Sequence, residues 1–260
     1  MRRLGAGRTT PVVHHMSDIF RHLLVLGRPA CGKSEFIDFL KHSNEQARRR
    51  LLHIGRFEEV DDFPWIWEKF MDDALWERAG HERLFTEEYM PGNPGMAPKG
   101  AKLFDFCMHK FNQVIAERYL GRDDFYRDST LLIEFSRGGT DGFRKALGLL
   151  DRAILDQAAI FYIHVSREES WRRNVARYQE KLRHSILAHM VPRQTYEHFY
   201  DVNDWEALTG GRPSGWLDMG GLRVPFVTMN NEPESTDPAV LEPRYAKALE
   251  RLWELRSGRP

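Results

Sequence analysis

The stretch His22–Phe36, HLLVLGRPACGKSEF, decides the fold of this chain. An apolar run ends in Gly27, and Gly32, Lys33 and Ser34 follow after four residues, which gives the pattern G-x-x-x-x-G-K-S. Consecutive backbone N–H groups in such a turn, at the start of a helix, can surround a phosphate, and the glycines let the backbone approach it closely. The apolar run predicts a buried strand, and KSEFIDFLKH predicts the helix that this pattern requires.

The pattern gives each residue of the turn a task. Lys33 would reach the β- and γ-phosphates as a point charge, and the Ser34 hydroxyl would be a ligand of the Mg²⁺ ion that bridges them. The other residues that the pattern places against the phosphate chain are Gly27, Arg28, Pro29, Ala30, Cys31, Gly32 and Glu35. We expect Cys31 to fill space in the turn rather than to act as a redox switch.

Composition narrows the class of protein. A chain of 260 residues with 42% hydrophobic residues can form a sizeable core. Basic and acidic residues are equal at 38 each, so no global field attracts nucleic acid or an anionic membrane. Two cysteines, Cys31 and Cys107, argue against a disulfide framework and favour a cytoplasmic location. No apolar run approaches the roughly 20 residues that span a bilayer. Residues 1–16 are predicted to be an N-terminal tail, with Met16 as an alternative start to Met1.

Short apolar runs alternate with longer amphipathic segments, which indicates an α/β fold with a mostly parallel five-stranded sheet and helices on both faces. The predicted strands are 22–27, 51–55, 130–135, 159–165 and 224–229. The predicted helices are 33–41, 65–78, 101–120, 142–156, 168–187, 192–208 and 238–255. We expect a single domain over 17–260, in which 57–128 is an insertion that elaborates on the sheet and 209–223 is a loop.

The glycine turn matches, at every fixed position, the phosphate-binding loop (P-loop) of the P-loop NTPases, and the chain resembles the P-loop kinases among them. This resemblance implies a three-layer α/β fold that binds ATP and Mg²⁺; the guanine-reading motif of GTPases is absent, which favours ATP. The segment TLLIEFSRGG resembles the Walker B region, where Glu134 would join the Mg²⁺ shell or take a proton from an attacking hydroxyl. Arg137 would lie against the phosphoryl acceptor, although Phe135 and Ser136 separate it from the acid, unlike in the deoxynucleoside kinases.

The segment after the fourth predicted strand, HVSREESWRRNVARYQEKLRH, resembles the lid of nucleotide kinases. The resemblance implies a lid over about 166–190, in which Arg173 and Arg177 stabilise the transferring phosphoryl group. An exposed helix face with Glu–Arg pairs is the alternative. In related kinases the loop after the last strand frames the adenine ring, which makes Asn230, together with Asn231, a candidate for base contacts; an ordinary turn is the alternative.

The phosphoryl acceptor is the least determined part of the prediction. Acids, aromatics and lysines follow the second predicted strand, at the position where P-loop kinases hold their acceptor, and each could instead be surface or core. They are Glu58, Glu59, Asp61, Asp62, Trp65, Trp67, Lys99 and Lys102. We expect a small-molecule hydroxyl or phosphate, such as a nucleoside or nucleotide; the oligomeric state is not predicted.

Two other functions stay open at this point. One is a P-loop ATPase or a regulatory nucleotide-binding protein. The other is a kinase that acts on a polynucleotide or another macromolecule, for which the arginine-rich stretches 47–50 and 171–177 would have to form a basic groove. Nucleic acid is not the favoured partner, and no membrane partner is expected.

Overall fold

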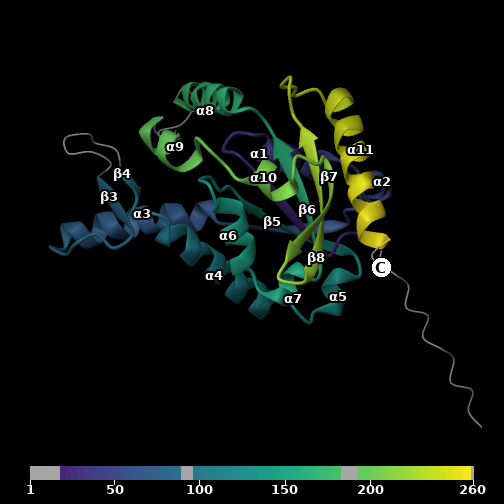
Figure 1. Ribbon diagram of the computed structural model, residues 1–260, viewed down its shortest axis with the longest axis horizontal. Helices are drawn as coiled ribbons and strands as arrows, with labels where there is room; N and C mark the ends of the chain where they lie inside the picture. Colours follow the sequence, from purple (N-terminus) through teal and green to yellow (C-terminus); the bar gives the residue numbers. More distant parts are fainter. Residues whose placement is uncertain (1–17, 89–95, 183–192, 259–260) are drawn as a thin grey trace, which may run out of the picture.

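The computed structural model of the chain describes residues 18–88, 96–182 and 193–258 (Figure 1). The predicted tail and the last part of the predicted lid, 183–190, lie outside these residues. The described residues form a six-stranded sheet in the order β2-β5-β1-β6-β8-β7, in which β7 alone runs antiparallel to its neighbour, and a separate hairpin of β3 and β4. The α/β class with a mostly parallel sheet is confirmed, with one strand more than expected.

The strands are β1 (His22–Gly27), β2 (Arg56–Asp61), β3 (Thr86–Glu88), β4 (Met96–Pro98), β5 (Ser129–Phe135), β6 (Ala158–His164), β7 (Ser214–Met219) and β8 (Leu222–Asn230). The helices are α1 (Lys33–His42), α2 (Glu45–Leu52), α3 (Phe63–Arg78), α4 (Lys102–Arg118), α5 (Asp123–Tyr126), α6 (Gly142–Leu149), α7 (Arg152–Leu155), α8 (Arg167–Leu182), α9 (Arg193–Tyr200), α10 (Trp205–Thr209) and α11 (Pro238–Ser257).

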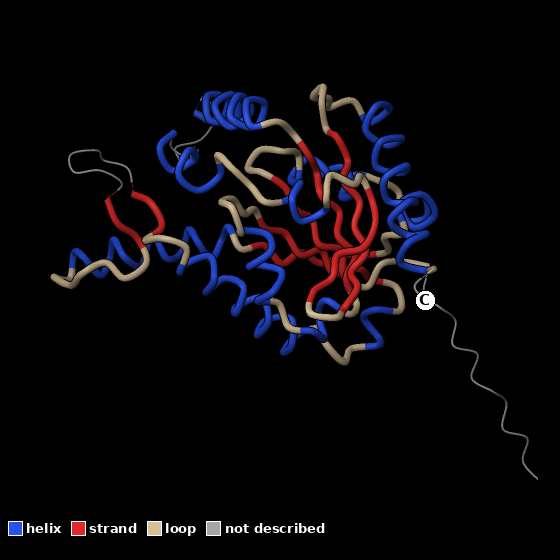
Figure 2. Tube along the Cα trace, in the orientation of Figure 1, coloured by secondary structure: helices blue, strands red, loops and turns tan. Residues whose placement is uncertain are grey.

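The central strand β1 shows how the sheet is built. Leu24 and Leu26 point to one face, where they pack in a core that includes residues of α4, α6, α7 and α10. Leu23 and Val25 point to the other face, toward a core that includes residues of α1, α2 and α11. Figure 2 shows the sheet, in red, between these helices. Both faces are therefore covered, as a parallel sheet requires.

The prediction of a second strand at 51–55 was wrong. Leu52 ends helix α2, and the strand lies further along the chain, at Arg56–Asp61. Because β2 is an edge strand with mostly exposed or partly exposed side chains, its sequence, RFEEVD, carries little apolar signal. The apolar residues Leu52 and Ile54 are instead core residues at and after the end of α2. This correction places Asp61 at the carboxyl end of a sheet strand.

Other elements also differ from the prediction. Residues 209–223 are not a plain loop, because β7 pairs with β8 through the turn Gly220–Gly221, where both glycines have positive φ values of 65° and 79°. The predicted helix 142–156 is divided into α6 and α7, and the predicted helix 192–208 into α9 and α10. In the second case Asp204 lies between the two helices, just before α10. Its carboxylate accepts hydrogen bonds from the backbone N–H groups of Phe143 and Arg144, at the start of α6.

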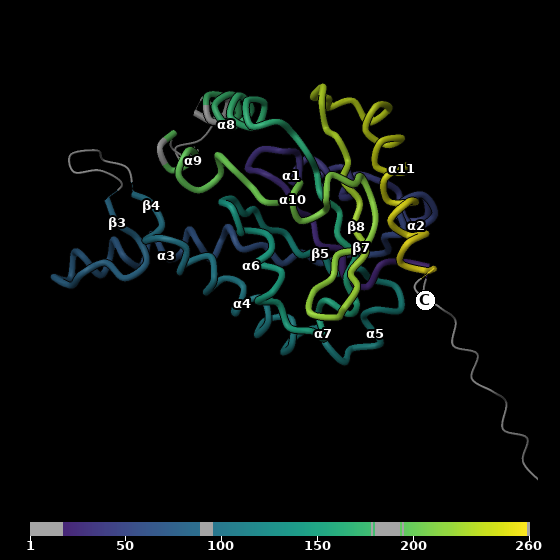
Figure 3. Tube along the Cα trace, in the orientation of Figure 1, coloured from purple at the N-terminus to yellow at the C-terminus, as the bar shows by residue number. Residues whose placement is uncertain are grey.

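Within the predicted insertion, α3 and the β3–β4 hairpin project from the body of the molecule, as the chain trace in Figure 3 also shows. We call these two elements the arm (Phe63–Arg78, Thr86–Glu88 and Met96–Pro98). A search of the described helices for a long, apolar span that could cross a membrane found none.

Candidate functional site

The carboxyl ends of three adjacent strands, β2, β5 and β1, meet the P-loop (residues 27–34). Glu134 near the end of β5 is in register with Asp61 of β2 on one side and with Val25 of β1 on the other. A cavity of about 250 Å³ opens at this edge. It is lined by Pro29, Ala30, Gly32, Lys33, Ser34, Glu35, Asp61, Asp62, Phe63, Ile66, Glu134, Phe135, Ser136, Asn174, Arg177 and Tyr200. Crevices at the carboxyl ends of parallel strands are where open α/β sheets bind ligands.

The two fixed glycines of the P-loop leave no room for side chains. A Cβ atom on Gly32, where φ is 110°, would lie 2.4 Å from Nδ2 of Asn231. A Cβ atom on Gly27 would lie 2.4 Å from Sγ of Cys31 and 2.5 Å from the carbonyl oxygen of Ile163. The loop is therefore packed tightly against the segments behind it, and only glycine fits at these two positions.

Side chains from distant segments hold the carbonyl groups of the P-loop. The Ser170 hydroxyl on α8 donates to the Pro29 carbonyl at 2.6 Å, and Nδ2 of Asn231 donates to the Cys31 carbonyl at 2.9 Å. In a planar trans peptide the next N–H group points the opposite way, so the amides of Ala30 and Gly32 point away from these two tethers. Both residues line the cavity. Backbone amides that face a cavity in this way are suited to binding an anion such as phosphate.

Lys33 is the buried cation of the cavity. Its Nζ donates to Oγ of Ser136 at 2.7 Å and to the Arg28 carbonyl at 3.3 Å, and lies 3.8 Å from Oε1 of Glu134. Burial alone would lower the pKa of the ammonium group, but negative charges nearby, including those of Glu134 and Asp61, outweigh it and raise the pKa. Lys33 therefore stays charged and can attract a phosphate.

Three carboxyl groups in the cavity, those of Asp61, Asp62 and Glu134, hold protons more tightly than usual, in each case chiefly because burial raises the pKa. Burial raises the pKa of Asp61 to about 7, and the charges of Glu134 and Asp62 add to this effect. Burial also raises the pKa of Glu134, although Lys33 opposes the rise. Oδ1 of Asp61 accepts a hydrogen bond from the backbone N–H of Phe63 at 3.0 Å, which fixes its orientation. A carboxyl group with a pKa near neutrality is well placed to accept a proton during a reaction.

A metal ion at this site would need phosphate oxygens as ligands in addition to the protein side chains. The described residues contain no group of three or more His, Cys, Asp or Glu side chains that could hold a metal by themselves. Ser34 and Glu134 both line the cavity, and they supply a hydroxyl and a carboxylate. Mg²⁺ is usually held by one or two such ligands together with substrate phosphates and water. This pair therefore fits a Mg²⁺ ion that arrives with a nucleotide.

The two predicted lid arginines on α8 have different surroundings. Arg177 is exposed and lines the cavity. Asn174, which is buried, also lines it. Arg173 is buried and outside the cavity lining; its Nη2 donates to the Asn231 carbonyl at 2.7 Å and its Nε to Glu169 at 2.6 Å. Arg173 therefore ties α8 to the segment after β8, whereas Arg177 remains beside the cavity.

Arg137 is also buried outside the cavity lining. Its Nη1 donates to Oδ2 of Asp62 at 2.6 Å, and its guanidinium lies 5.1 Å and 5.0 Å from the ring centres of Phe104 and Phe135. Of the two residues in this ion pair, Asp62 lines the cavity. The structure thus gives Arg137 the position of a support for Asp62.

Five residues predicted to contact the nucleotide lie outside the lining of the cavity: Gly27, Arg28, Cys31, Asn230 and Asn231. Arg28 donates to the carbonyl groups of Tyr200 and Asp201, and so fixes the P-loop to the end of α9. The exposed Asn230 donates to the Glu232 carbonyl at 3.4 Å.

Ser136, Asn174 and Tyr200 line the cavity without having been predicted. For Ser136 a signal was present, since it directly follows the strand that carries Glu134. Asn174 and Tyr200 lie in helices whose orientation toward the cavity depends on the tertiary structure.

Comparison with known proteins leaves the relatives of this chain undetermined. No family model and no curated protein matches it. Among solved structures, a gluconokinase from Sinorhizobium meliloti 1021 is 12% identical, with a TM-score of 0.45 over 92% of this chain and 97% of that one. An unliganded sugar kinase from Janibacter sp. HTCC2649 is 12% identical, with a TM-score of 0.43 over 89% and 95%. Chaetomium thermophilum Kti12 in complex with ADP-AlF3 is 11% identical, with a TM-score of 0.41 over 90% and 98%.

These scores are too low to carry an argument about activity, and the assignment of the fold rests on the chain itself. A buried strand leads through GRPACGKS into helix α1, and the sheet around it is mostly parallel and covered by helices on both faces. The chain therefore has the α/β architecture of a P-loop NTPase, with the phosphate-binding loop between β1 and α1.

Proposed function

We propose that this protein is an ATP-dependent phosphotransferase, which moves the γ-phosphoryl group of ATP to a hydroxyl group of a small molecule. The observation that carries the proposal is the content of one cavity. It brings a buried, charged Lys33 next to the P-loop amides and adds the acid Asp61, whose pKa is raised to about 7. The first two features suit a phosphate chain, and the acid suits the activation of a nucleophile.

The nucleotide would be held by its phosphates. The amides of Ala30 and Gly32 would donate to phosphate oxygens, and Lys33 would exchange its bond to Ser136 for one to the β- and γ-phosphates. Ser34 and Glu134 would hold Mg²⁺, which supplies positive charge against the phosphate oxygens. A second cavity, of about 590 Å³, shares Ser34 and Glu35 with the first and extends to the start of α11, where it has room for the rest of the nucleotide.

The acceptor would enter on the side of β2. Asp61 would accept the proton of the attacking hydroxyl, and Asp62, oriented by Arg137, would accept a hydrogen bond from another polar group of the acceptor. Arg177 would neutralise charge that develops on the transferring phosphoryl group. The ion pair between Arg137 and Asp62 positions a carboxylate in this scheme and does not touch the phosphates.

The direct test is phosphoryl transfer from γ-labelled ATP and Mg²⁺ to a panel of nucleosides, nucleotides, sugars and short oligonucleotides. We expect label on one class of acceptor. Lys33→Ala should lower the rate by a factor on the order of 10² to 10³. Lys41→Ala is a matched control, because Lys41 is an exposed lysine on the same helix and pairs with Glu59 at the surface.

The products separate the possible activities. Free phosphate as the sole labelled product, formed at a rate that depends on Lys33, would replace the kinase by an ATPase, since Asp61 could equally activate water. Label on the oligonucleotide alone would replace the small-molecule acceptor by a macromolecule. Equal activity in Lys33→Ala and the wild type would contradict the site itself.

A further inference from the structure

The outer face of α3 in the arm carries a row of exposed apolar side chains. Phe63, Trp67, Met71 and Leu75 are 44%, 45%, 51% and 55% exposed, and they follow one another at every fourth residue. Residues four apart lie on the same side of a helix, so these side chains form a stripe that winds slowly around α3. We call these four residues the α3 stripe.

The inner side of the same helix is occupied by a different set of residues. The ring of Trp65 packs edge-on against Phe111 of α4 at 4.9 Å, and the Lys110 ammonium lies 5.0 Å from the centre of the Trp65 ring. Helix α3 therefore has apolar side chains on two sides, and α4 packs against one of these sides. Large apolar side chains grouped on a surface favour contact with another molecule, because their hydration costs free energy.

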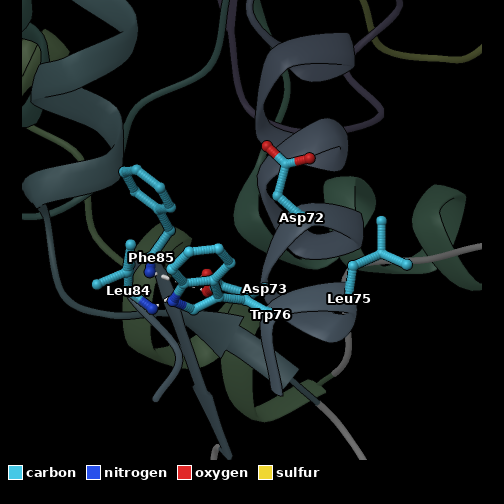
Figure 4. Close-up of a pocket in the computed structure, with 6 residues that line it drawn as sticks. All are labelled: Asp72, Asp73, Leu75, Trp76, Leu84 and Phe85. Atoms are coloured by element: carbon cyan, nitrogen blue, oxygen red, sulfur yellow. Dashed lines mark hydrogen bonds between the residues drawn. The ribbon is translucent and has the colours of Figure 1, made fainter. Parts of the chain in front are cut away.

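The arm is held in one shape by the buried carboxylate of Asp73. It accepts hydrogen bonds from the backbone N–H groups of Leu84, Phe85 and Thr86 and from the Thr86 hydroxyl, at 2.6 to 3.0 Å. These bonds fasten the chain before β3 to α3. Next to them lies a cavity of about 410 Å³, lined by Asp72, Asp73, Leu75, Trp76, Leu84 and Phe85 (Figure 4). The end of the α3 stripe thus borders a preformed hollow.

The arm is strongly acidic, although the whole chain has no net charge. Residues 63–88 contain seven acids and three bases, a net charge of −4. Three of the acids are paired, Asp72 with Lys69 at 2.7 Å, Glu77 with Arg83 at 3.3 Å and Glu68 with Lys110 of α4 at 3.5 Å. The acids Glu82, Glu87 and Glu88 are exposed. A partner for this surface therefore needs apolar groups for the stripe and positive charges for its surroundings.

We propose that the α3 stripe and the adjoining hollow are a docking surface for an amphipathic, basic helix of a partner protein. Such a helix presents apolar side chains three and four residues apart, which can pack along the stripe, and its Lys and Arg residues meet the acids of the arm. The same acids repel the phosphates of a single-stranded nucleic acid and the arm of a second copy of this chain. Phe63 also lines the P-loop cavity, so one end of the docked helix lies at the mouth of that cavity. The proposal does not depend on phosphoryl transfer.

Binding of a synthetic helix to the full chain tests this proposal. The probe is a fluorescein-labelled peptide of about 18 residues, five turns of helix, with leucine along one face and lysine elsewhere; the comparison peptide has glutamate in place of lysine. We expect the lysine peptide to bind with an affinity that falls as salt is added. The double variant Met71→Ser/Leu75→Ser should weaken it by about tenfold or more. Val240→Ser, which removes an exposed apolar side chain on α11, should leave it unchanged.

Each of the other outcomes would overturn the proposal. Equal affinity of the wild type and Met71→Ser/Leu75→Ser would show that the stripe is not the docking surface, and equal affinity for the glutamate peptide would remove the role of charge. A single-stranded oligonucleotide whose binding the double variant abolishes would assign the surface to nucleic acid. A dimer in analytical ultracentrifugation that dissociates in the double variant would assign it to a second copy.

Discussion

Asp61, at the end of β2 just before helix α3, and Asp73, within α3, differ in how many hydrogen bonds their carboxyl groups accept. Asp73 accepts four hydrogen bonds from the segment Leu84–Thr86, and these outweigh the effect of burial and hold its pKa below the usual value. Asp61 accepts a hydrogen bond from the backbone of Phe63 and faces the carboxyl group of Glu134, and burial raises its pKa to about 7. A carboxylate saturated with donors has no capacity left for a ligand, whereas one with few donors and a like charge nearby can still take a proton.

The largest effect should come from Asp61→Asn. Asparagine keeps the shape and can still accept the hydrogen bond from Phe63, but it cannot take a proton. We expect kcat for phosphoryl transfer to fall by a factor on the order of 10² to 10⁴, with a melting temperature equal to that of the wild type or higher. Steady-state kinetics and thermal unfolding on the same preparation check both. A variant with full kcat would show that Asp61 is not the base.

Asp73→Ala should give the opposite result. It leaves buried N–H groups of the arm without an acceptor, which should destabilise the protein by about 2 to 4 kcal/mol. The kcat for transfer should change by less than about twofold, because the hydrogen bonds that are lost lie far from the reacting atoms. Urea denaturation and hydrogen exchange of the Leu84, Phe85 and Thr86 amides measure the first effect. Loss of kcat without loss of stability would make the arm part of the catalytic machinery.

The dependence on pH should differ for the same two acids. Because Asp61 accepts a proton only when ionised, the rate of transfer should fall about tenfold for each pH unit below about 7 and level off above it. In the unfolded chain the pKa of an aspartate is about 3.9, so the folded state binds more protons between about pH 4 and 7. The contribution of Asp61 to the free energy of unfolding therefore decreases as the pH rises through this window.

Asp73 has a lowered pKa, so its stabilising contribution is complete above the pKa of the unfolded chain and is lost as the pH falls through the folded pKa. Stability curves of the wild type, Asp61→Asn and Asp73→Ala, measured from pH 8 down to the pH at which the protein unfolds in acid, separate the contributions. The assignment would fail if the residual activity of Asp61→Asn showed the same decline below about pH 7 as the wild type.

The smallest effect concerns the hydroxyl group of Thr86 in the arm, which donates to Asp73 and accepts from Arg83. Thr86→Val keeps the volume and the backbone N–H but removes the hydroxyl that donates to Asp73 at 2.7 Å. We expect a loss of about 1 kcal/mol. In a variant that already carries Asp73→Ala the same substitution should cost less, since only the hydrogen bond that the hydroxyl accepts from Nη1 of Arg83, at 2.9 Å, remains to be lost. A full loss in both backgrounds would mean that Thr86 acts through packing rather than through this hydrogen bond.

The sequence was most informative where the structure is local. The P-loop is a run of consecutive residues with a strand before it and a helix after it, so the positions of Lys33 and Ser34 at the start of that helix could be predicted from the pattern alone. Glu134 was accessible for the same reason, because it lies near the end of a plainly apolar strand. In contrast, β2 is an exposed edge strand with little apolar content, and its displacement by several residues hid the position of Asp61.

The arginines show the limit of such reasoning. Arg137 and Arg173 have the spacing that suggests phosphate contacts, yet their surroundings are decided by Asp62 and Asn231, which are distant in the sequence. A guanidinium group binds whichever acceptor the tertiary structure brings within reach. Their predicted catalytic roles therefore could not be judged from spacing. Arg177 lies beside the cavity, and its role as a lid arginine stays a prediction.

The tethers behind the P-loop have a consequence for how such a site is inherited. The Ser170 and Asn231 side chains that orient its peptide groups lie 141 and 200 positions away from the carbonyl groups they hold. A descendant could keep every letter of GRPACGKS and still lose the orientation of its amides through a change at either distant position. The motif and the geometry of the site can thus change independently in evolution. A family defined by the motif alone would include members whose P-loop amides no longer face a phosphate.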